Sequence, residues 1–201
     1  MDPRVNNMAC KLILASKSPR RRAFFDMLGL EYEAISPDVD ESVDKTLTPS
    51  DTVKAIAAKK ALACAGDGLF VIAADTVVVL DGKILGKPKD REDARKMISS
   101  YSGRSHEVIT GFAIVCDGKI FSASTSTKVF FKKLSGAQIK YYLDTDEPYD
   151  KAGAYGIQGI AGLFVNRIEG DYNNVVGLPL CDLDSLMIEK FGFGLNKFKK
   201  S

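Results

Sequence analysis

Two Asp-Gly pairs constrain the fold of this chain more than any other feature. Asp81-Gly82 and Asp117-Gly118 each stand between two apolar runs, an arrangement that favours the tight turn of a β-hairpin. Elsewhere, apolar strand-like runs alternate with helix-like segments, which is the pattern of a parallel sheet. Hairpins within that alternation place antiparallel neighbours in the same sheet. The chain is therefore predicted to be α/β, with a mixed sheet and flanking helices.

Apolar runs and helix-capping residues predict where the individual elements lie. The predicted strands are 11–15, 32–36, 69–80, 106–115, 120–131 and 163–168. The predicted helices are 19–28, 48–65, 91–101, 135–143 and 180–191. Ser18 is the expected N-cap of the first helix and Pro19 its first residue. The stretch 144–162 is rich in Gly, Tyr and charged residues and is predicted to be irregular.

Size, charge and cysteine spacing exclude several classes of protein. The 201 residues suit one domain or two small lobes. The 28 basic and 26 acidic side chains nearly balance, which argues against a nucleic-acid polymer as partner. No apolar run reaches the roughly 18 to 20 residues that span a bilayer. Residues 1–9 have no apolar h-region, so a secretory signal is not expected. A cytoplasmic location is expected, with no membrane partner and with four widely spaced cysteines as free thiols.

The first candidate site is the segment Ser16-Lys-Ser-Pro-Arg-Arg. It joins a predicted strand to a helix N-terminus, where backbone amides and the helix dipole favour bound phosphate. Ser16 and Ser18 add hydroxyl groups, while Arg20 and Arg21 add guanidinium donors suited to phosphate oxygens. The alternative is a capped helix whose arginines are simply solvated.

The second candidate pairs two carboxylates. Asp75 interrupts the apolar run 69–80, where a buried acid is costly unless it is paired, hydrogen-bonded or metal-bound. A metal ligand or general base is favoured there, and a structural salt bridge is the alternative. Glu41 belongs to an acidic loop that would by itself be read as solvated. Together, Asp75 and Glu41 could hold Mg²⁺ against a triphosphate.

Further candidates are two lysines and an amide. Lys60 lies on a predicted helix, and Lys87 stands in a Gly-Lys-Pro turn; isolated lysines are mostly surface charge. Gln158, in the irregular stretch, has an amide able to read a base edge. No G-x-x-x-x-G-K-[ST] or G-x-G-x-x-G motif occurs, which counts against kinases, GTPases and dehydrogenases. The lone His106 is expected to be structural.

In combination, these segments resemble the Maf family of nucleotide pyrophosphatases, also called septum-formation-protein homologues. The matching segments occur in the family's order and cover about residues 11–191, nearly the whole chain. They are Leu-Ala-Ser-x-Ser-Pro-Arg-Arg (14–21), Ala-x-x-Lys-Ala (57–61), Ala-Asp-Thr-Val-Val (74–78), Gly-Lys-Pro (86–88), Ser-Gly-Arg-x-His-x-Val-x-Thr (102–110), Glu-Pro-x-Asp-Lys-Ala-Gly-Ala-Tyr-Gly-Ile-Gln-Gly (147–159) and Val-Val-Gly-Leu-Pro (175–179).

The resemblance implies a fold like that of the inosine triphosphate pyrophosphatases, an elongated mixed sheet with two lobes around a cleft, often dimeric. It implies hydrolysis of a nucleoside triphosphate between the α- and β-phosphates, with Mg²⁺ or Mn²⁺ as cofactor. By position, the catalytic set comprises Asp75, Glu41, Lys60 and Lys87, with the metal on Asp75 and Glu41. The substrate-binding set comprises Ser16, Ser18, Arg20, Arg21, Thr76 and Gln158. Arg20, Thr76 and Gln158 match the branch that prefers dTTP and UTP; other branches act on 7-methyl-GTP or on CTP and UTP.

The same resemblance suggests how the chain is divided and what else it could do. One domain over 11–195 is expected, preceded by an extension (1–10) and followed by a basic, frayed tail (196–201). Two alternatives to the pyrophosphatase stay open. One is a nucleotide-sensing regulator of cell division without turnover, and the other is a general phosphatase that releases orthophosphate.

Overall fold

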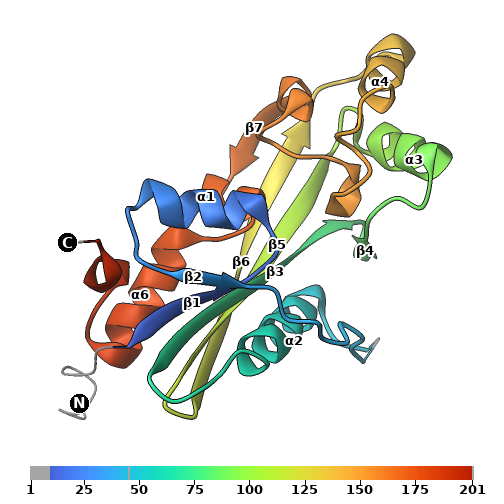
Figure 1. Cartoon of the computed structure of the whole chain (residues 1–201). Helices are drawn as coiled ribbons and strands as arrows, with labels where there is room; N and C mark the ends of the chain where they lie inside the picture. Colours follow the sequence, from blue (N-terminus) through green and yellow to red (C-terminus); the bar gives the residue numbers. More distant parts are fainter. Residues whose placement is uncertain (1–9, 45, 201) are drawn as a thin grey trace. The chain divides into compact units, whose positions relative to one another are not determined.

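The computed structural model describes residues 10–44 and 46–200, and its centre is one mixed sheet (Figure 1). Six of its seven strands follow the order β2-β1-β3-β5-β6-β7, and the seventh, β4, pairs with β3 outside that path. The predicted extension 1–10 lies, except for Cys10, outside the described residues. The strands are β1 (Lys11–Ala15), β2 (Glu33–Ile35), β3 (Leu69–Leu80), β4 (Lys83–Leu85), β5 (Ser105–Cys116), β6 (Lys119–Phe131) and β7 (Val165–Glu169).

The chain divides into two compact units. Unit 1 comprises the described part of residues 1–75, 110–125 and 177–201, and unit 2 comprises 76–109 and 126–176. Strands β3, β5 and β6 each begin in one unit and end in the other. The predicted mixed α/β sheet with flanking helices is confirmed. The predicted cleft between two lobes stays a prediction.

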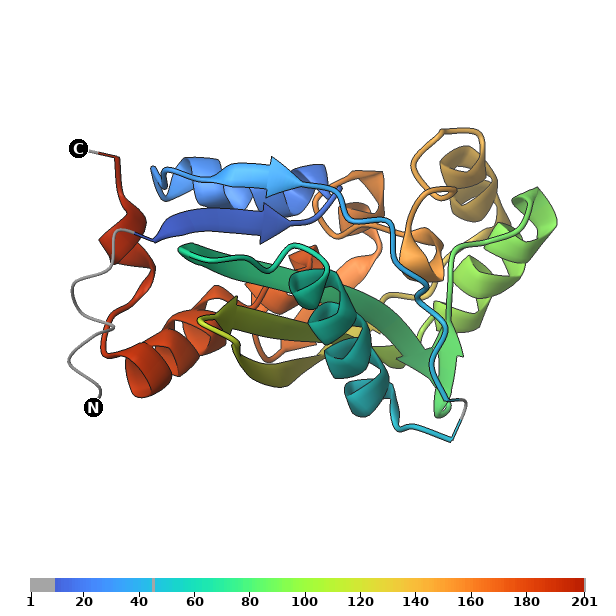
Figure 2. The same cartoon turned by 60° about the horizontal axis from the view of Figure 1, so that its bottom comes forward.

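Unit 1 contains the parallel strands of the sheet together with the turn and adjoining arms of the β5–β6 hairpin. β1 pairs in parallel with β2 and with the start of β3 (Figure 2), and Ala15 lies opposite Ala73. Ala57 and Ala61 of one helix pack with Ala73 in a buried apolar cluster, and burial of such side chains stabilises the unit. The helices of unit 1 are α1 (Pro19–Met27), α2 (Pro49–Leu62), α6 (Leu180–Phe191) and the 3₁₀ turn η4 (Leu195–Phe198).

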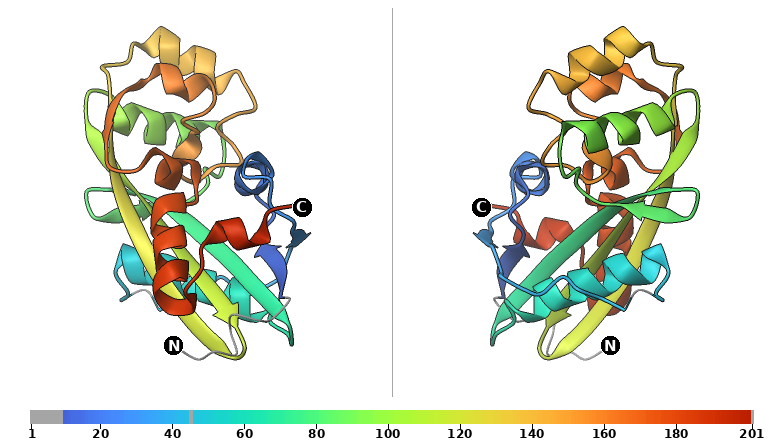
Figure 3. Two further views of the ribbon diagram at one scale, coloured as in Figure 1. Left: turned by 90° about the vertical axis from the view of Figure 1, so that its left-hand side faces the viewer. Right: turned by 90° about the vertical axis from the view of Figure 1, so that its right-hand side faces the viewer.

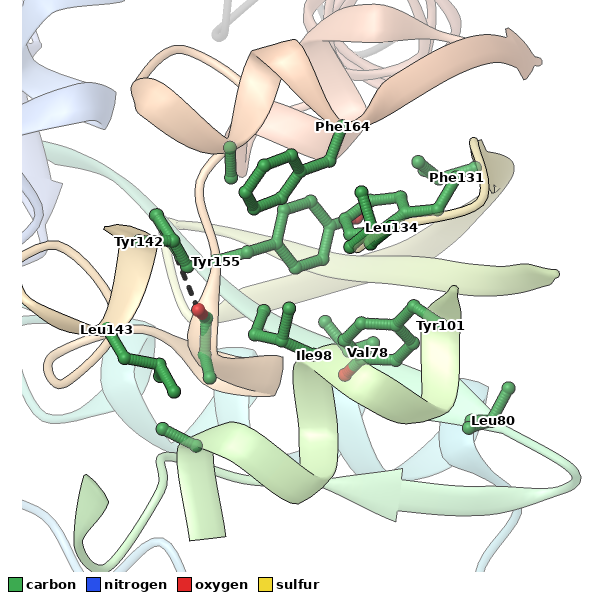
Figure 4. Packing of buried hydrophobic residues seen from close by; sticks show 14 of the residues in the cluster. Val78, Leu80, Ile98, Tyr101, Phe131, Leu134, Tyr142, Leu143, Tyr155 and Phe164 are labelled. Carbon is green, nitrogen blue, oxygen red and sulfur yellow. Dashed lines mark hydrogen bonds between the residues drawn. The ribbon is translucent and has the colours of Figure 1, made fainter. Parts of the chain in front are cut away.

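Unit 2 has an aromatic core. Tyr101, Tyr142, Tyr155, Phe131 and Phe164 gather there with aliphatic side chains (Figure 4). The ring centroids of Tyr142 and Phe164 lie 5.2 Å apart at a steep angle, the edge-to-face geometry that aromatic pairs prefer. The helices of unit 2 are α3 (Arg91–Tyr101), α4 (Gly136–Leu143), α5 (Tyr172–Val176) and the 3₁₀ turns η2 (Ala152–Ala154) and η3 (Ile160–Leu163). Figure 3 shows α3 beside α4 and η2.

Both predicted Asp-Gly hairpin turns are confirmed. Asp81 and Asp117 have φ of 51° and 49°, and the glycines that follow have φ of 74° and 70°. Two successive positive φ values define the turn that suits hairpin twist. Helices α3 and α6 begin where predicted, and α4 begins one residue later, at Gly136, with Ser135 as its N-cap. No helix among residues 10–44 and 46–200 combines the length and apolar character needed to cross a membrane.

The prediction of a frayed tail is wrong for residues 196–200. Residues 195–198 form the turn η4, and Phe198 is only 8% exposed. The Phe198 carbonyl accepts a hydrogen bond from the Glu31 amide at 2.7 Å, and the Lys200 amide donates to the Gly29 carbonyl at 2.9 Å. Burial of an aromatic side chain, together with paired backbone groups, holds this segment in place despite its charge.

His106 is structural, as the sequence predicts. It is 2% exposed, and its Nε2 lies 2.6 Å from the Tyr155 hydroxyl. Its Nδ1 is buried and has no hydrogen-bond partner among the described residues. Burial lowers the pKa of His106 from 6.5 to about 4, because a charged imidazolium would lose its hydration there.

This lowered pKa predicts an acid-labile fold. Between pH 6.5 and about 4 the unfolded chain binds a proton at His106 that the folded chain does not. Stability is therefore complete above pH 6.5 and decreases as the pH falls toward 4, by about 3 kcal/mol. Urea unfolding of the wild type and of His106→Phe across this range measures the difference. A folded-state NMR titration of the only histidine with a midpoint near 6.5 would contradict it.

Candidate active site

The loop between β1 and α1 places polar groups at a helix N-terminus. Ser16 is buried, and its Oγ accepts a hydrogen bond from the Ser18 amide at 3.1 Å. Ser18 occupies the predicted N-cap position and Pro19 begins α1, but the Ser18 side chain does not cap the helix. Arg20 is half-buried in the first turn. The amides of this turn and the positive end of the helix dipole favour an anion.

Arg21 is buried within unit 1 and binds backbone groups. Its Nε donates to the Gly177 carbonyl at 2.7 Å, and one terminal nitrogen donates to the Ala74 carbonyl at 2.8 Å and to Ser16 Oγ at 3.3 Å. Burial lowers its pKa to about 10, opposed in part by the charge of Asp75. Arg21 is therefore a cation at neutral pH that joins three segments of unit 1. Its phosphate contact stays a prediction.

Three charged side chains from distant parts of the sequence meet in unit 1. Lys60 Nζ lies 2.7 Å from Asp75 Oδ1 and 2.9 Å from Glu41 Oε1. The side chains of Lys60 and Asp75 are 14% and 16% exposed, whereas that of Glu41 is 58% exposed. The salt bridge that was the alternative reading of Asp75 is present. Because its partner Lys60 is itself a candidate residue, the Lys60–Asp75 pair is compatible with a structural salt bridge and with a catalytic or metal-binding role for Asp75.

The alternation of side chains along β3 explains why Asp75 meets Lys60. Successive residues of a strand point to opposite faces, so Asp75 shares a face with Ala73 and Val71. Both of these pack against α2, the helix that carries Lys60. The strand therefore presents its one acid to α2, whose residues pack on the same face in this cluster.

A glycine allows α2 to approach the sheet closely. A Cβ placed on Gly111 of β5 would lie 2.4 Å from the carbonyl carbon of Val53 and 2.6 Å from the Lys54 amide nitrogen. Both are backbone atoms of α2, so neither can rotate away. Gly111 thus sets the depth at which Lys60 sits above the sheet.

The pair Asp75 and Glu41 fits a divalent metal that arrives with a substrate. Within the described ranges 10–44 and 46–200, no group of three or more His, Cys, Asp or Glu side chains could hold a metal ion. Mg²⁺, however, is commonly bound by one or two carboxylates together with substrate phosphates. Two carboxylates that face one ammonium group, as here, supply that donor set.

Three candidate residues belong to unit 2. Thr76 is half-buried and follows Asp75 directly, Lys87 is exposed in its turn, and Gln158 is exposed between Gly156 and Gly159. The structure joins the segments of Lys87 and Gln158 indirectly, because the Gly153 amide donates to the Gly86 carbonyl at 2.9 Å. That these three residues bind the same substrate as Asp75 stays a prediction.

Sequence reasoning gave no role to Glu147 or to the carbonyl of Gly177. The Glu147 carboxylate accepts two backbone hydrogen bonds, from the Ile160 and Ala161 amides. Glu147 stands out in the sequence as the first residue of the motif Glu-Pro-x-Asp-Lys-Ala-Gly. Its role cannot be assigned, however, without knowing which backbone amides bond to it. A carbonyl that binds a buried arginine leaves no trace in sequence at all.

A polar hollow in unit 2 contains other residues. Its volume is about 650 Å³, and it is lined by Asp81, Gly103, Arg104, Ser105, Phe130, Phe131, Asn166 and Arg167. Arg104 pairs with Asp81, and Arg167 pairs with Glu169. Each cation thus has an exposed carboxylate partner, and the hollow shares no residue with the candidate set.

Known proteins resemble this chain over most of its length. A protein from Chromobacterium violaceum named "dTTP/UTP pyrophosphatase" is 46% identical, covering 92% of this chain and 96% of its own. Another of that name from Geotalea uraniireducens is 49% identical, covering 86% and 91%. The Staphylococcus aureus Ham1 structure aligns with a TM-score of 0.41 at 18% identity, covering 77% and 90%, too distant to bear on the fold. The family model described as Maf-like protein matches residues 11–190, and this chain belongs to the Maf family.

Proposed function

We propose that this chain hydrolyses nucleoside triphosphates, dTTP and UTP foremost, to the monophosphate and pyrophosphate. The observation that carries the proposal is the contact of Lys60 with both Asp75 and Glu41 in the unit that also holds the serine–arginine loop. Phosphoryl transfer needs mainly positioned cations and an oriented nucleophile; this set supplies cations and a carboxylate that could orient an attacking water. The names of relatives 46% and 49% identical support the choice of nucleotide.

In the proposed mechanism, Asp75 is the general base. It accepts a proton from water as the water oxygen bonds to the α-phosphorus, and the bond from that phosphorus to the bridging oxygen of the β-phosphate breaks. Pyrophosphate leaves, and the monophosphate keeps the new oxygen. Lys60, 2.7 Å from Asp75, orients the carboxylate, while Ser16, Ser18 and Arg20 bind phosphate oxygens. Placed charges of this kind supply most of the acceleration.

A divalent cation, Mg²⁺ or Mn²⁺, is proposed as cofactor on Asp75 and Glu41. When bound, it neutralises charge on the triphosphate and polarises its phosphoryl oxygens. Arg21 adds a buried positive charge close to the same carboxylate. We assign Lys87 to the phosphates as well, in line with the family pattern of its Gly-Lys-Pro turn.

Base choice is assigned to Thr76 and Gln158, while Arg20, which binds phosphate, completes the family pattern of the branch that prefers dTTP and UTP. The Gln158 amide offers one donor group and one acceptor, which complement the imide edge shared by uracil and thymine. The exposed position of Gln158 in its turn supports this role. We further propose that the protein acts in the cytoplasm on free nucleotides as a single domain over 11–195 and that it assembles as a homodimer.

A panel of nucleoside triphosphates tests the proposal. Purified protein is incubated with each nucleotide and Mg²⁺ or Mn²⁺, and pyrophosphate, orthophosphate and nucleotide products are quantified. Pyrophosphate with UMP or dTMP is the expected result. Orthophosphate would identify a general phosphatase, and turnover restricted to 7-methyl-GTP or another purine would overturn the base assignment. Binding without any product would indicate a nucleotide sensor instead.

A further inference from the structure

The short turn η3 is capped by a side chain thirteen residues upstream. Glu147 Oε2 accepts a hydrogen bond from the Ile160 amide at 2.7 Å, and its Oε1 accepts one from the Ala161 amide at 3.3 Å. These are the first two amides of η3 (Ile160–Leu163), and the first amides of a helical turn have no acceptor within the turn itself. A carboxylate that accepts them satisfies both donors and complements their partial positive charge.

This cap fixes the turn that contains Gln158. The Gly159 amide donates to the Gly156 carbonyl at 3.1 Å, which places Gln158 within a tight turn directly before η3. Gly159 lies against the capping carboxylate, because a Cβ placed on it would be 2.3 Å from Glu147 Oε2. The backbone of this turn therefore rests on Glu147 along its C-terminal side.

Glu147 itself is held in place. The Tyr142 hydroxyl, on a fully buried side chain, lies 3.2 Å from Glu147 Oε1. Lys151 Nζ donates to the Glu147 carbonyl at 2.9 Å, and the Lys151 alkyl chain lies beneath Gly156. The turn thus has a support at each end. Gly156 lies against the Lys151 side chain, which is hydrogen-bonded to Glu147, and Gly159 lies against the Glu147 carboxylate.

We propose that Glu147 is a positioning residue for base recognition, acting through the Gln158 turn rather than on the reacting phosphate. The proposal rests on the proposed function, because it assumes that Gln158 reads the base. A displaced turn would move the Gln158 amide relative to the base edge, and such a misplacement weakens the directional hydrogen bonds that distinguish one base from another. The hydrogen bonds of this network all join residues of unit 2.

The test compares Glu147→Gln with a matched control, Asp184→Asn. Asp184 Oδ1 accepts a hydrogen bond from the Leu195 amide at 2.6 Å and lies against Gly194, so it caps η4 as Glu147 caps η3. In Glu147→Gln, the amide nitrogen faces one of the two backbone donors and cannot accept its hydrogen bond. Steady-state kinetics with UTP and CTP are measured for the wild type, both variants, Gln158→Ala and the Glu147→Gln, Gln158→Ala double variant.

Glu147→Gln is expected to raise the KM for UTP about tenfold and to lower the UTP-over-CTP ratio of kcat/KM by a similar factor. Its kcat is expected to stay within about twofold of wild type, and Asp184→Asn to keep the wild-type ratio. The double variant is expected to lose no more selectivity than Gln158→Ala alone, since coupled residues are non-additive. Equal loss with both nucleotides, an unchanged ratio, or full additivity would overturn the inference.

These outcomes separate the inference from the proposed function. An active wild type with unaltered selectivity in Glu147→Gln overturns only the role of Glu147. If the wild type hydrolyses no nucleotide, the proposed function fails, and the same ratio is measured as dissociation constants for non-hydrolysable UTP and CTP analogues. A tenfold smaller binding preference in Glu147→Gln would then support the positioning role, and an equal preference would overturn it. Hydrogen exchange at the Ile160 amide reports whether the cap has been lost.

Discussion

Asp75→Asn is expected to lower kcat for pyrophosphate release by about 10³-fold while the protein stays folded. Asparagine has nearly the same shape as aspartate but cannot take a proton from water at neutral pH. Lys60 would keep its second partner, because Glu41 Oε1 lies 2.9 Å from its Nζ. The buried ammonium group is therefore not left without a counter-charge, and the cost to stability should be moderate.

Single-turnover kinetics at saturating UTP, with thermal unfolding in parallel, measure both parts of this prediction. Asp40→Asn is the control, because Asp40 is exposed one residue from Glu41 and its carboxylate accepts hydrogen bonds from the amide and hydroxyl of Ser42. Its activity should remain within about twofold of wild type, as for surface substitutions in general. Near-normal turnover in Asp75→Asn would remove the general base from the mechanism.

Gly111→Ala is expected to have the largest effect on stability, a loss of about 3 kcal/mol. The added methyl group would lie 2.4 Å from the Val53 carbonyl carbon. Since that atom belongs to the backbone of α2, the helix must shift away from β5, which opens the packing around Ala57 and Ala61. Activity should fall as well, because α2 carries Lys60.

Urea unfolding midpoints of wild type, Gly111→Ala and Gly136→Ala measure this effect. Gly136 is the first residue of α4, and a Cβ on it would meet nothing within 4 Å. Alanine there should be neutral or stabilising by about 0.5 to 1 kcal/mol, because it restricts the unfolded chain. If both variants unfold at the wild-type midpoint, α2 can move away from β5 at no cost. The close contact of α2 with Gly111 would then contribute nothing to the free energy of unfolding.

Sequence patterns predicted correctly those helices and strands whose ends are marked by nearby residues. The bounds of β3 and of α6 are as predicted, because a long apolar run and a terminal glycine mark them. The five-residue helix α5 and the turns η2 and η3 were missed, since such short segments carry no periodic signal. The tail was mispredicted because its charge is local whereas the burial of Phe198 depends on distant residues.

The candidate site shows the same division between local and tertiary information. The sequence identifies the candidate residues themselves: an acid within an apolar strand, and serines and arginines at the start of a helix. The direction of Arg21 cannot be predicted in this way, because its partners Ala74 and Gly177 are far away in sequence. Likewise, the contact of Lys60 with both Asp75 and Glu41 depends on how closely α2 packs on the sheet. That approach is set by one glycine whose role is visible only in three dimensions.

The aromatic core of unit 2 has an optical consequence. The chain contains seven tyrosines and no tryptophan, and every tyrosine except Tyr32 belongs to unit 2. Tyr101, Tyr142 and Tyr155 are buried there among other rings. Intrinsic fluorescence and near-ultraviolet circular dichroism therefore report chiefly on unit 2, whereas far-ultraviolet dichroism reports on both units. Coincident melting curves from the two signals would mean that the units unfold together, and a separation would give the stability of each without any label.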